Sequence, residues 1–526
     1  MKRLLIVLFF GSLTINLFSQ NLPKSFSFTS DSETINDFPA SNSIERILFV
    51  EDTIWIATSK GLSKSTDYGN TWINFYRHKD FGEDGVSAIG YYNGTVWAAT
   101  WKMDNIAGSS VPTGTGLHYS TDFGKTWNNI KQPVDDPSDS IITYGINKIR
   151  ALPVTVPQQN FVYDIAFTKN TIWIVCFAGG LRKSTDMGKT WQRVVLPPDN
   201  LDSIKPTDTL KFSLQPVAGK FGKESYLNHR AFSLLTVDDT TIYVGTAGGI
   251  NKSTDGGISW IKFNHTNQEQ PISGNFILSI QHNKFDNSIW AATWKAEGLD
   301  EYYALSSSND GGKTWKTFLT NEKILDIDFK YYGDANNYTH ADIFAATENG
   351  LFRSNNSGKS WLAVQEIIDS KTGLPINIKN QRYRAVKVKQ KESVTDIWIG
   401  TLDGLVKFTD INNNWDGEWK VFLSSKKLNT SNDSYAFPNP FSPDEEVVRI
   451  KYKIEKSANV TIRIFDFGMN LVRTLIQNVN KTLKGEQIEF WDGKDENGKI
   501  VPNGVYFYRI DIDSNEPLFG KIIVLM

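Results

Sequence analysis

An eight-residue stretch that recurs along the chain restricts its possible folds more than any other feature. Residues 120–127 read STDFGKTW, and the other copies keep the pattern of Ser, Asp, Gly and Trp, except that Asn356 replaces the aspartate in the last copy. The copies begin at Ser65, Ser120, Ser184, Ser253, Ser308 and Ser354. Repetition at this spacing indicates one supersecondary unit that is used many times, since a single unit cannot bury its own apolar face.

Each octapeptide belongs to a larger repeat of β-rich runs. An apolar run such as 54–58 (IWIAT) precedes it, and a second run that often opens with Gly lies between that apolar run and the octapeptide. One further β-run stands before these two runs, and another follows the octapeptide. Seven such units occur, with their apolar runs at residues 54–58, 96–100, 172–175, 242–246, 289–293, 343–347 and 397–401. Seven four-stranded antiparallel units predict an all-β protein with a seven-bladed β-propeller, because ring closure covers every blade face. The seventh unit has lost the octapeptide and carries residues 410–419 in its place.

The octapeptide's chemistry predicts a structural turn between the third and fourth strands. Asp can accept hydrogen bonds from nearby backbone N–H groups, and Gly adopts backbone angles that other residues resist. The Trp is expected to pack back across the turn, so that its loss costs about 3–5 kcal/mol. The octapeptide aspartates are therefore expected to hold turns and not to act as catalytic acids: Asp67, Asp122, Asp186, Asp255 and Asp310.

The same strand order sorts the loops between two faces. The octapeptides lie on one face, and most long insertions are expected on the other, where function concentrates on a rigid scaffold. These insertions are residues 74–85, 102–115, 128–160, 197–228 and 295–303, while residues 331–341 form an exception on the octapeptide face.

Two copies of AATWK place Trp101 and Trp294 at strand ends that enter long loops. Exposed Trp there could stack on a sugar ring or clamp a peptide, whereas the alternative is that both rings cap the core. The ligand-binding candidates also include charged groups from the long-loop face: Arg77, His78, Lys102, His229, Arg230 and Lys295.

Catalytic chemistry has weaker support in the sequence. Glycoside hydrolysis needs two carboxylates about 5–10 Å apart, and Asp164 with Glu297 or Asp300 could supply them. The six His residues have no zinc-site spacing. A calcium-like run at residues 410–416 has Trp415 where an EF-hand loop needs Gly, so we expect no cofactor beyond a marginal calcium site.

The lone cysteine excludes any disulfide within the chain. Cys176 lies in an apolar run and is expected to be a small buried side chain. The formal net charge of −2 gives no field that favours nucleic acid.

The chain begins with a predicted secretory signal peptide. Lys2 and Arg3 precede an apolar stretch at residues 4–13, and Ser19 lies near a plausible cleavage site. The apolar stretch is too short for a membrane anchor, so the mature chain is expected to be exported and to lack a transmembrane segment. The expected organisation is residues 1–20 signal peptide, 21–43 lead segment, 44–423 propeller, 424–434 linker and 435–526 C-terminal domain.

The octapeptide resembles the Asp-box, also called the BNR repeat. Asp-box propellers include sialidases, sortilins, xyloglucan-degrading endoglucanases and photosystem II assembly-factor-like proteins. Residues 397–405 (IWIGTLDGL) also resemble the repeat of two-component regulators. These families share a turn and not a chemistry, so the resemblance implies the fold more than the function.

Short alternating runs after residue 435 predict a small β-sandwich. WDGKDENGKIVPNGVYFYRI at residues 491–510 resembles the Ig-like domain of the flagellar hook-capping protein, and FPNPFSP at 437–443 with GKIIVLM at the end resembles the type IX secretion sorting domain. The resemblance implies export by the type IX machinery, although the chain ends in VLM where sorting tails are Lys-rich. A plain Ig-like spacer is the alternative.

Together these features predict a monomeric, secreted or cell-surface β-propeller. The favoured function is non-catalytic binding of extracellular glycan or protein on the long-loop face. The alternative is a secreted glycoside hydrolase that acts on polysaccharide.

Overall fold

The computed structural model describes residues 34–214, 227–335, 337–364, 366–376, 382–391, 394–412 and 414–526. The expected signal peptide, most of the expected lead segment and part of the link at 197–228 lie outside these residues. Within the described ranges, no helix has both the length and the hydropathy that crossing a bilayer requires.

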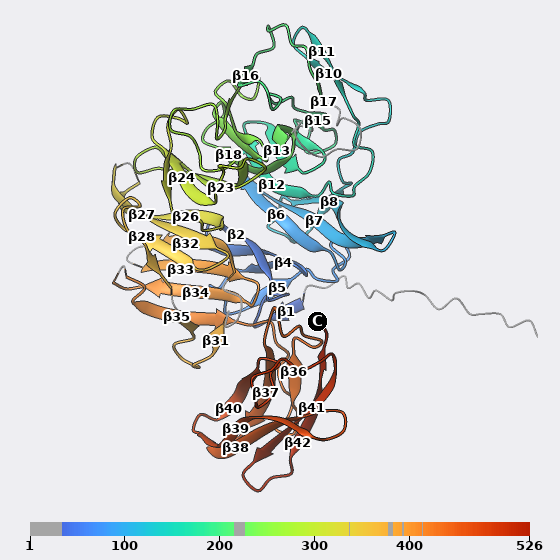
Figure 1. Ribbon diagram of the computed structural model, residues 1–526, viewed down its shortest axis with the longest axis vertical. Coiled ribbons are helices and arrows are strands. Elements are labelled where there is room, and N and C mark those ends of the chain that lie inside the picture. The colour runs from blue at the N-terminus through green and yellow to red at the C-terminus, as the bar shows by residue number, and fades with distance from the viewer. Residues whose placement is uncertain are drawn as a thin grey trace, which may run out of the picture.

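Seven antiparallel sheets in the described chain share one order of four strands, and we call them blades 1 to 7 (Figure 1). Blades 1 to 3 contain β2 (Ile44–Val50), β3 (Thr53–Thr58), β4 (Gly61–Ser65) and β5 (Trp72–Asn74); β6 (Gly85–Tyr92), β7 (Thr95–Ile106), β8 (Ser109–Ser120) and β9 (Asn128–Ile130); and β12 (Val162–Thr168), β13 (Thr171–Cys176), β14 (Gly180–Ser184) and β15 (Gln192–Arg193). Blades 4 and 5 contain β18 (Ala231–Thr236), β19 (Ile242–Thr246), β20 (Gly249–Ser253) and β21 (Trp260–Phe263); and β22 (Phe276–Asn283), β23 (Ser288–Trp294), β24 (Ala304–Ser308) and β25 (Lys316–Phe318). Blades 6 and 7 contain β26 (Ile324–Asp334), β27 (Asn337–Thr347), β28 (Leu351–Ser354) and β29 (Leu362–Ala363); and β32 (Tyr383–Lys391), β33 (Val394–Thr401), β34 (Leu405–Asp410) and β35 (Gly417–Phe422).

The blades close into a ring through their first strands. Each first strand contacts the first strand of the next blade, and β32 of blade 7 contacts β2 of blade 1. Side chains add to this closure, because Arg384 pairs with Glu45 at 2.9 Å and Lys391 pairs with Asp52 at 3.0 Å. The fold is therefore an all-β, propeller-like ring, as the repeat predicts.

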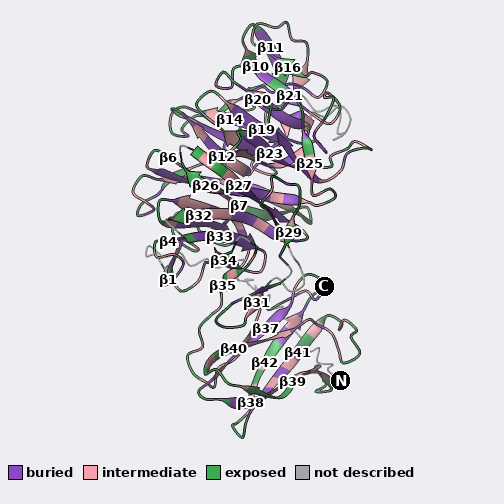
Figure 2. Ribbon diagram, turned by 90° about the vertical axis from the view of Figure 1, so that its left-hand side faces the viewer, coloured by how far each residue is buried: buried purple, intermediate pink, exposed green. Residues whose placement is uncertain are grey.

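The second strand of each blade lies at the centre of the packing. In β3 every residue after Thr53 is buried, including Ile54 and Trp55, and β13 repeats this pattern. Both faces of a blade are covered by neighbours, so these strands are continuously apolar and do not alternate. Figure 2 shows buried residues along the sheets of the ring. Cys176 ends such a strand and is buried, which raises the pKa of its thiol to about 12.

Each octapeptide forms a turn with two successive left-handed residues. In blade 1 these are Tyr68, with φ 57°, and Gly69, with φ 81°. A Cβ on Gly69 would lie 2.9 Å from the rings of Trp398 and Phe422 in blade 7. The glycine is therefore required twice, by its backbone angle and by close contact with the preceding blade. The octapeptide joins neighbouring blades as well as neighbouring strands.

The octapeptide carboxylates accept hydrogen bonds from residues of their own turns. In blade 3 the N–H and hydroxyl of Thr190 donate to Asp186 at 2.9 and 2.6 Å, and the Ser184 hydroxyl donates at 2.8 Å. The same hydrogen bonds form at Asp67, Asp122, Asp255 and Asp310. In blade 6 the Asn356 amide oxygen accepts from the Ser360 N–H at 2.9 Å.

These contacts predict acid sensitivity. Hydrogen bonds from Thr190 and Ser184 lower the pKa of Asp186 to about 2. In the other four copies burial would raise the pKa of the aspartate, but the equivalent hydrogen bonds of each turn outweigh it and lower the pKa. A carboxyl whose pKa is lower in the folded state stabilises above its unfolded pKa of about 4 and loses that contribution as the pH falls towards 2. We expect the midpoint of thermal unfolding to fall between pH 4 and pH 2. Asp186→Asn should lower the midpoint at neutral pH and show a smaller further drop in acid, and an equal drop would contradict this account.

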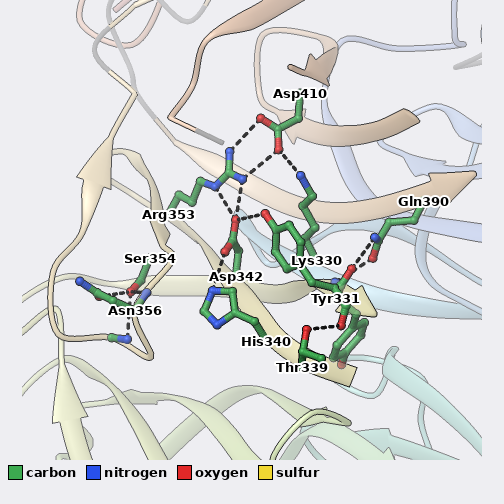
Figure 3. A network of polar contacts seen from close by, with 12 residues as sticks. Lys330, Tyr331, Thr339, His340, Asp342, Arg353, Ser354, Asn356, Gln390 and Asp410 are labelled. Atoms are coloured by element: carbon green, nitrogen blue, oxygen red, sulfur yellow. Dashed lines mark hydrogen bonds and ion pairs between the residues drawn. The ribbon is translucent and has the colours of Figure 1, made fainter. Parts of the chain in front are cut away.

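Blade 7 lacks the octapeptide, and a buried ion network takes its place at the seam with blade 6 (Figure 3). Arg353 donates to Asp342 through Nε at 3.0 Å and through Nη2 at 2.5 Å, and to Asp410 at 3.0 and 2.8 Å. Lys330 also pairs with Asp410, at 2.7 Å. In blades 1 and 4 the residue at the position of Arg353 is a lysine, Lys64 or Lys252, that donates to a backbone oxygen in the next octapeptide turn. With no such turn in blade 7, the cation pairs with carboxylates.

Residues 102–115 differ from the expected loop. They continue the ladder of β7 and β8, with Lys102 opposite Thr113, and the hairpin ends at Ala107 and Gly108, which have φ of 51° and 82°. Two left-handed residues form the tight turn that matches strand twist, so the segment remains a hairpin. Residues 331–334 and 337–341 likewise pair with each other as the ends of β26 and β27.

Several short strands lie outside the four-strand order of the blades. Blades 1 and 4 each gain a fifth strand, and the described parts of the links contain two small sheets and one 3-10 helix. These elements are β1 (Thr34–Asn36), β16 (Ser203–Ile204), β10 (Ile141–Tyr144), β11 (Asn147–Ala151), β17 (Ser213–Leu214), β30 (Ile367–Ile368), β31 (Pro375–Ile376) and η1 (Leu227–His229).

The C-terminal residues form a separate body beside β1 and β35 (Figure 1). Two antiparallel sheets, in the orders β36-β37-β40 and β39-β38-β41-β42, share a core around Tyr452, Ile462 and Trp491. The strands are β36 (Tyr435–Phe437), β37 (Val448–Ile454), β38 (Ala458–Phe465), β39 (Leu471–Lys481), β40 (Gly485–Trp491), β41 (Gly504–Ile512) and β42 (Leu518–Val524).

Candidate functional site

The face that carries the links between blades is shaped by a repeated β-bulge. In every first strand the pairing with the second strand shifts after the first or second residue, which leaves one residue unpaired. The unpaired residues are Glu45, Ser87, Tyr163, Phe232, Leu278, Leu325 and Arg384. Bulges re-aim side chains, and here they give the link face a charged sector at Glu45 and Arg384 and an aromatic sector at Tyr163 and Phe232.

A continuous row of aromatic rings crosses blades 2 to 5 on this face, and we call it the aromatic strip. Its members are Trp101, Phe161, Tyr163, Phe232, Phe276, Trp294 and Tyr303. The centroids of successive rings lie between 4.2 and 6.2 Å apart. Phe232 is buried, and the other six rings are half-buried. The partly exposed members of the strip therefore come from blades 2, 3 and 5, and the buried Phe232 of blade 4 connects them.

Strand direction explains why these rings share one face. First strands begin on the link face, second strands end on it and third strands begin on it. Phe276 begins a first strand and Phe161 directly precedes one. Trp101 and Trp294 lie at or near the end of the blade portion of second strands, and Tyr303 precedes a third strand. One antiparallel order repeated in each blade thus brings together rings that are far apart in sequence.

The two Trp residues predicted from AATWK both contact neighbouring groups of the ring and both remain half-buried. Trp294 donates its indole N–H to the carbonyl of Ile324 at 2.7 Å, which ties blade 5 to blade 6. Lys323 lies 5.3 Å from its ring centroid, and the ring remains half-buried. Trp101 stacks on Phe161 at 5.6 Å and is also half-buried.

The link at residues 128–160 is fastened beside the strip by a buried ion pair. Asp135 lies 2.6 Å from Arg182 and 3.5 Å from Arg193, and it accepts the N–H of Val154 at 2.7 Å. Asn228 holds the end of the next link, because its amide donates to the carbonyl of Pro197 at 2.7 Å. These contacts attach the described parts of both links to the ring beside the strip.

The charged ligand-binding candidates are dispersed around the link face. Arg77 is exposed and pairs with Glu83 at 2.9 Å, whereas His78 is buried with its ring nitrogen 3.4 Å from Asp80. Lys102 pairs with Asp104 at 3.2 Å on the β7–β8 hairpin, and Lys295 is exposed after β23.

His229 and Arg230 lie next to the strip. Burial, together with repulsion from Arg182 and Arg193, lowers the pKa of His229 to about 4, so its ring is neutral at pH 7. The Arg230 guanidinium lies 5.0 Å from the ring centroid of Phe177. Arg230 therefore places a cation beside the aromatic sector.

The three catalytic candidates occupy two separate places. Asp164 lies on β12 and faces the ring axis, where its charged neighbours are Arg46 and Asp326 from blades 1 and 6. Burial raises its pKa, and its two carboxylate oxygens accept the N–H groups of Ile165 and Leu234, each at 2.9 Å. Asp164 thus ties blade 3 to blade 4.

The other two candidates, Glu297 and Asp300, are exposed on the loop between β23 and β24. No contact among the described residues brings Asp164 together with either of them. The acid that organises this loop is Glu301, which accepts the N–H groups of Ala296 and Gly298 at 2.7 and 3.0 Å.

Two residues of the calcium-like run at 410–416, Asp410 and Trp415, make contacts with other parts of the ring. Asp410 pairs with Arg353 and Lys330, and the Trp415 indole donates to the carbonyl of Leu362 at 3.0 Å. In the part of the chain that the structure describes, no group of three or more His, Cys, Asp or Glu could hold a metal ion.

No protein-family profile matches the chain. A probable oligoxyloglucan-reducing end-specific xyloglucanase from Neosartorya fischeri is 22% identical over 316 residues, which are 56% of this chain and 34% of that protein. The chain therefore spans about a third of the length of this curated relative.

Two solved structures of GH74 enzymes are also similar. A crystal structure of an ancestral GH74 enzyme aligns with a TM-score of 0.51 and 13% identity, over 94% of this chain and 63% of that chain. A GH74 enzyme from Niastella koreensis aligns with a TM-score of 0.47 and 12% identity, over 92% and 73%. The first alignment shows that the chain shares the β-propeller fold with the ancestral enzyme.

Sequence reasoning identified two members of the aromatic strip and missed five. Phe161, Tyr163, Phe232 and Phe276 lie at or directly before the start of apolar first strands, where they are indistinguishable from core residues. A signal was present, because an aromatic residue stands at or just before the bulge in blades 3, 4 and 5. Aligning the repeats on that position would have grouped them.

Proposed function

We propose that the protein is a non-catalytic binding module that holds an extended glycan along the aromatic strip. The observation that carries the proposal is the row of aromatic rings on the link face, six of them half-buried, on a closed ring of blades. Ring faces of Trp, Tyr and Phe offer apolar contact with fixed geometry, and they lose little conformational entropy on binding. A sugar polymer lying across several blades would contact one ring after another.

The proposal includes where the protein acts. A signal peptide at residues 1–20 and an Ig-like sorting domain at residues 435–526 would export the chain by the type IX machinery to the outer cell surface or the medium. The FPNPFSP motif and the paired C-terminal sheets support this part of the proposal. The protein would act there as a monomer.

Isothermal titration calorimetry of the full chain with xyloglucan and cello-oligosaccharides tests the binding function, after a glycan-array screen that includes other polysaccharides. We expect saturable binding to a glycan, and Trp101→Ala or Phe161→Ala should weaken it at least about tenfold, which corresponds to about 1.4 kcal/mol. Tyr92→Ala is the matched control, since Tyr92 is an exposed aromatic at the opposite end of a first strand. Glycan binding that survives both strip variants would contradict the proposal, as would retention of peptides alone.

A second function, glycoside hydrolysis, has one specific observation in its favour. The curated relative is a probable xyloglucanase, and the solved structure that aligns with a TM-score of 0.51 is an ancestral GH74 enzyme. Its test is the release of reducing ends from xyloglucan. Turnover that Glu297→Gln, Asp300→Asn or Asp164→Asn abolishes would favour the hydrolase over the binding module.

A further inference from the structure

The ring and the C-terminal body are joined by a buried ion pair. Arg449 on β37 is 1% exposed, and its guanidinium makes two hydrogen bonds to Asp403 in the turn between β33 and β34, one of them at 2.7 Å. The linker lies against the C-terminal body, because the Tyr435 hydroxyl and the Lys451 ammonium both donate to the carbonyl of Lys426, at 2.6 and 3.0 Å. The junction therefore has defined geometry.

A cleft of about 880 Å³ lies at this junction. One wall is the edge of the ring, including Gly69 in the blade 1 octapeptide and Phe422 on β35. The other walls are the linker and the end of β39 with β40. A ligand in the cleft would contact both bodies at once. This place is separate from the aromatic strip on the link face.

The charges that line the cleft do not balance. Its six lysines are Lys371, Lys420, Lys427, Lys451, Lys481 and Lys484, and its three carboxylates are Asp37, Glu486 and Glu489. Each carboxylate has one lysine partner. Lys451 lies 2.7 Å from Glu486, Lys481 lies 2.5 Å from Glu489, and Lys427 contacts Asp37.

Three lysines remain without an ion pair among the described residues: Lys371, Lys420 and Lys484. Two come from the ring and one from the C-terminal body. Burial and repulsion from Lys407 and Lys371 lower the pKa of Lys420, while Asp369 and Asp67 act in the opposite direction. The Lys420 ammonium donates to the side-chain oxygen of Asn70 at 3.2 Å and makes no ion pair within the described part of the chain. The nearby carboxylate of Asp369 accepts backbone N–H groups of Lys371, Thr372 and Val421.

We propose that the junction cleft binds a phosphorylated ligand that bridges Lys371 and Lys420 of the ring to Lys484 of the C-terminal body. Lysine binds phosphate as a flexible point charge, so three ammonium groups can surround one ligand without a rigid fork. A phosphate group carries a charge of about −1.5 to −2, so three lysines match a ligand with two phosphate groups. Bound at the junction, the ligand holds the two bodies together.

Calorimetric titration of the full chain with inorganic pyrophosphate at low salt tests the site. We expect saturable binding with one ligand per chain, which Lys420→Gln and Lys484→Gln each weaken at least fivefold and which added salt weakens further. Lys313→Gln, in the exposed octapeptide turn of blade 5, is the matched control and should leave the affinity unchanged. Absence of saturable binding, or equal affinity in all three variants, would overturn the proposal.

Two further arms separate the ligand's source and its effect. Phosphatidylcholine vesicles with and without phosphatidic acid test a lipid headgroup, and retention by the acidic vesicles that pyrophosphate competes away would assign the site to headgroups. Binding of pyrophosphate without vesicle retention would assign it to a soluble ligand. Saturating pyrophosphate should also slow trypsin cleavage in the linker at residues 424–434, and an unchanged rate would overturn the bridging of the two bodies.

Discussion

Arg353→Ala is expected to lower the free energy of unfolding by about 3–5 kcal/mol, because it leaves two buried carboxylates without their main partner. Arg353 and Asp342 are each 1% exposed, and the side chain of Asp410 has no exposed surface. Burial alone would raise the pKa of Asp410, but hydrogen bonds from Arg353 and Lys330 outweigh it and lower the pKa. Without Arg353, Asp410 keeps its pair with Lys330, and Asp342 keeps its contacts with His340 and the hydroxyl of Tyr332.

Urea unfolding followed by tryptophan fluorescence measures this effect. The control is Arg77→Ala, which removes an exposed pair with Glu83 and should leave the unfolding curve almost unchanged. The loss of stability in Arg353→Ala should also depend on pH. Protonation of the two carboxyls that Arg353 contacts removes their buried charge, so the difference in free energy of unfolding between variant and wild type should become smaller in acid. If both arginine variants unfold at the same urea concentration, the network at the seam of blades 6 and 7 does not hold the ring closed.

Trp72→Ala is expected to lower the free energy of unfolding by a similar amount, about 3–5 kcal/mol, through lost packing. Trp72 ends the blade 1 octapeptide, is 0% exposed and packs edge-on against Phe422 of blade 7 at 6.1 Å. Its indole N–H makes no hydrogen bond within the described part of the chain, so the loss comes from the cavity and not from a broken polar contact. The affected interface is the one that closes the ring.

Two variants separate packing from the octapeptide itself. Trp361→Ala changes the same motif position in blade 6, where the ring is only half-buried, and should cost clearly less. Trp72→Phe keeps most of the apolar volume and should also cost less than Trp72→Ala. The same urea unfolding measurement applies to all three, and an equal cost at Trp72 and Trp361 would mean that burial does not set the effect.

Much of the fold could be predicted because its signals are local. The position of every octapeptide turn follows from residues within eight positions of one another, such as Ser184, Asp186 and Thr190. The extension of β7 and β8 was missed, because Lys102 and its neighbours alternate weakly and the turn at Ala107 and Gly108 lacks the usual Asn-Gly or Asp-Gly pair.

The candidate site was predicted only in part. Trp101 and Trp294 stand out because the sequence repeats around them, whereas Tyr163 and Phe232 look like core residues of apolar strands. A bulge changes where such a residue points, and nothing in the local sequence marks the bulge. The structure places Asp164 at the ring axis and Glu297 on an exposed loop, a separation that strand direction alone does not reveal.

The sequence by itself determined the number of repeats, the strand order within each blade and the chemistry of the turns, because each depends on contacts between residues close in the chain. The tertiary structure alone decided which distant groups meet. Arg353 reaches Asp410 across 57 residues, Arg384 reaches Glu45 across 339, and the aromatic strip and the lysine cleft each combine segments from several blades or from both bodies. Such contacts depend on how the ring closes, which packing between blades fixes and no local pattern encodes.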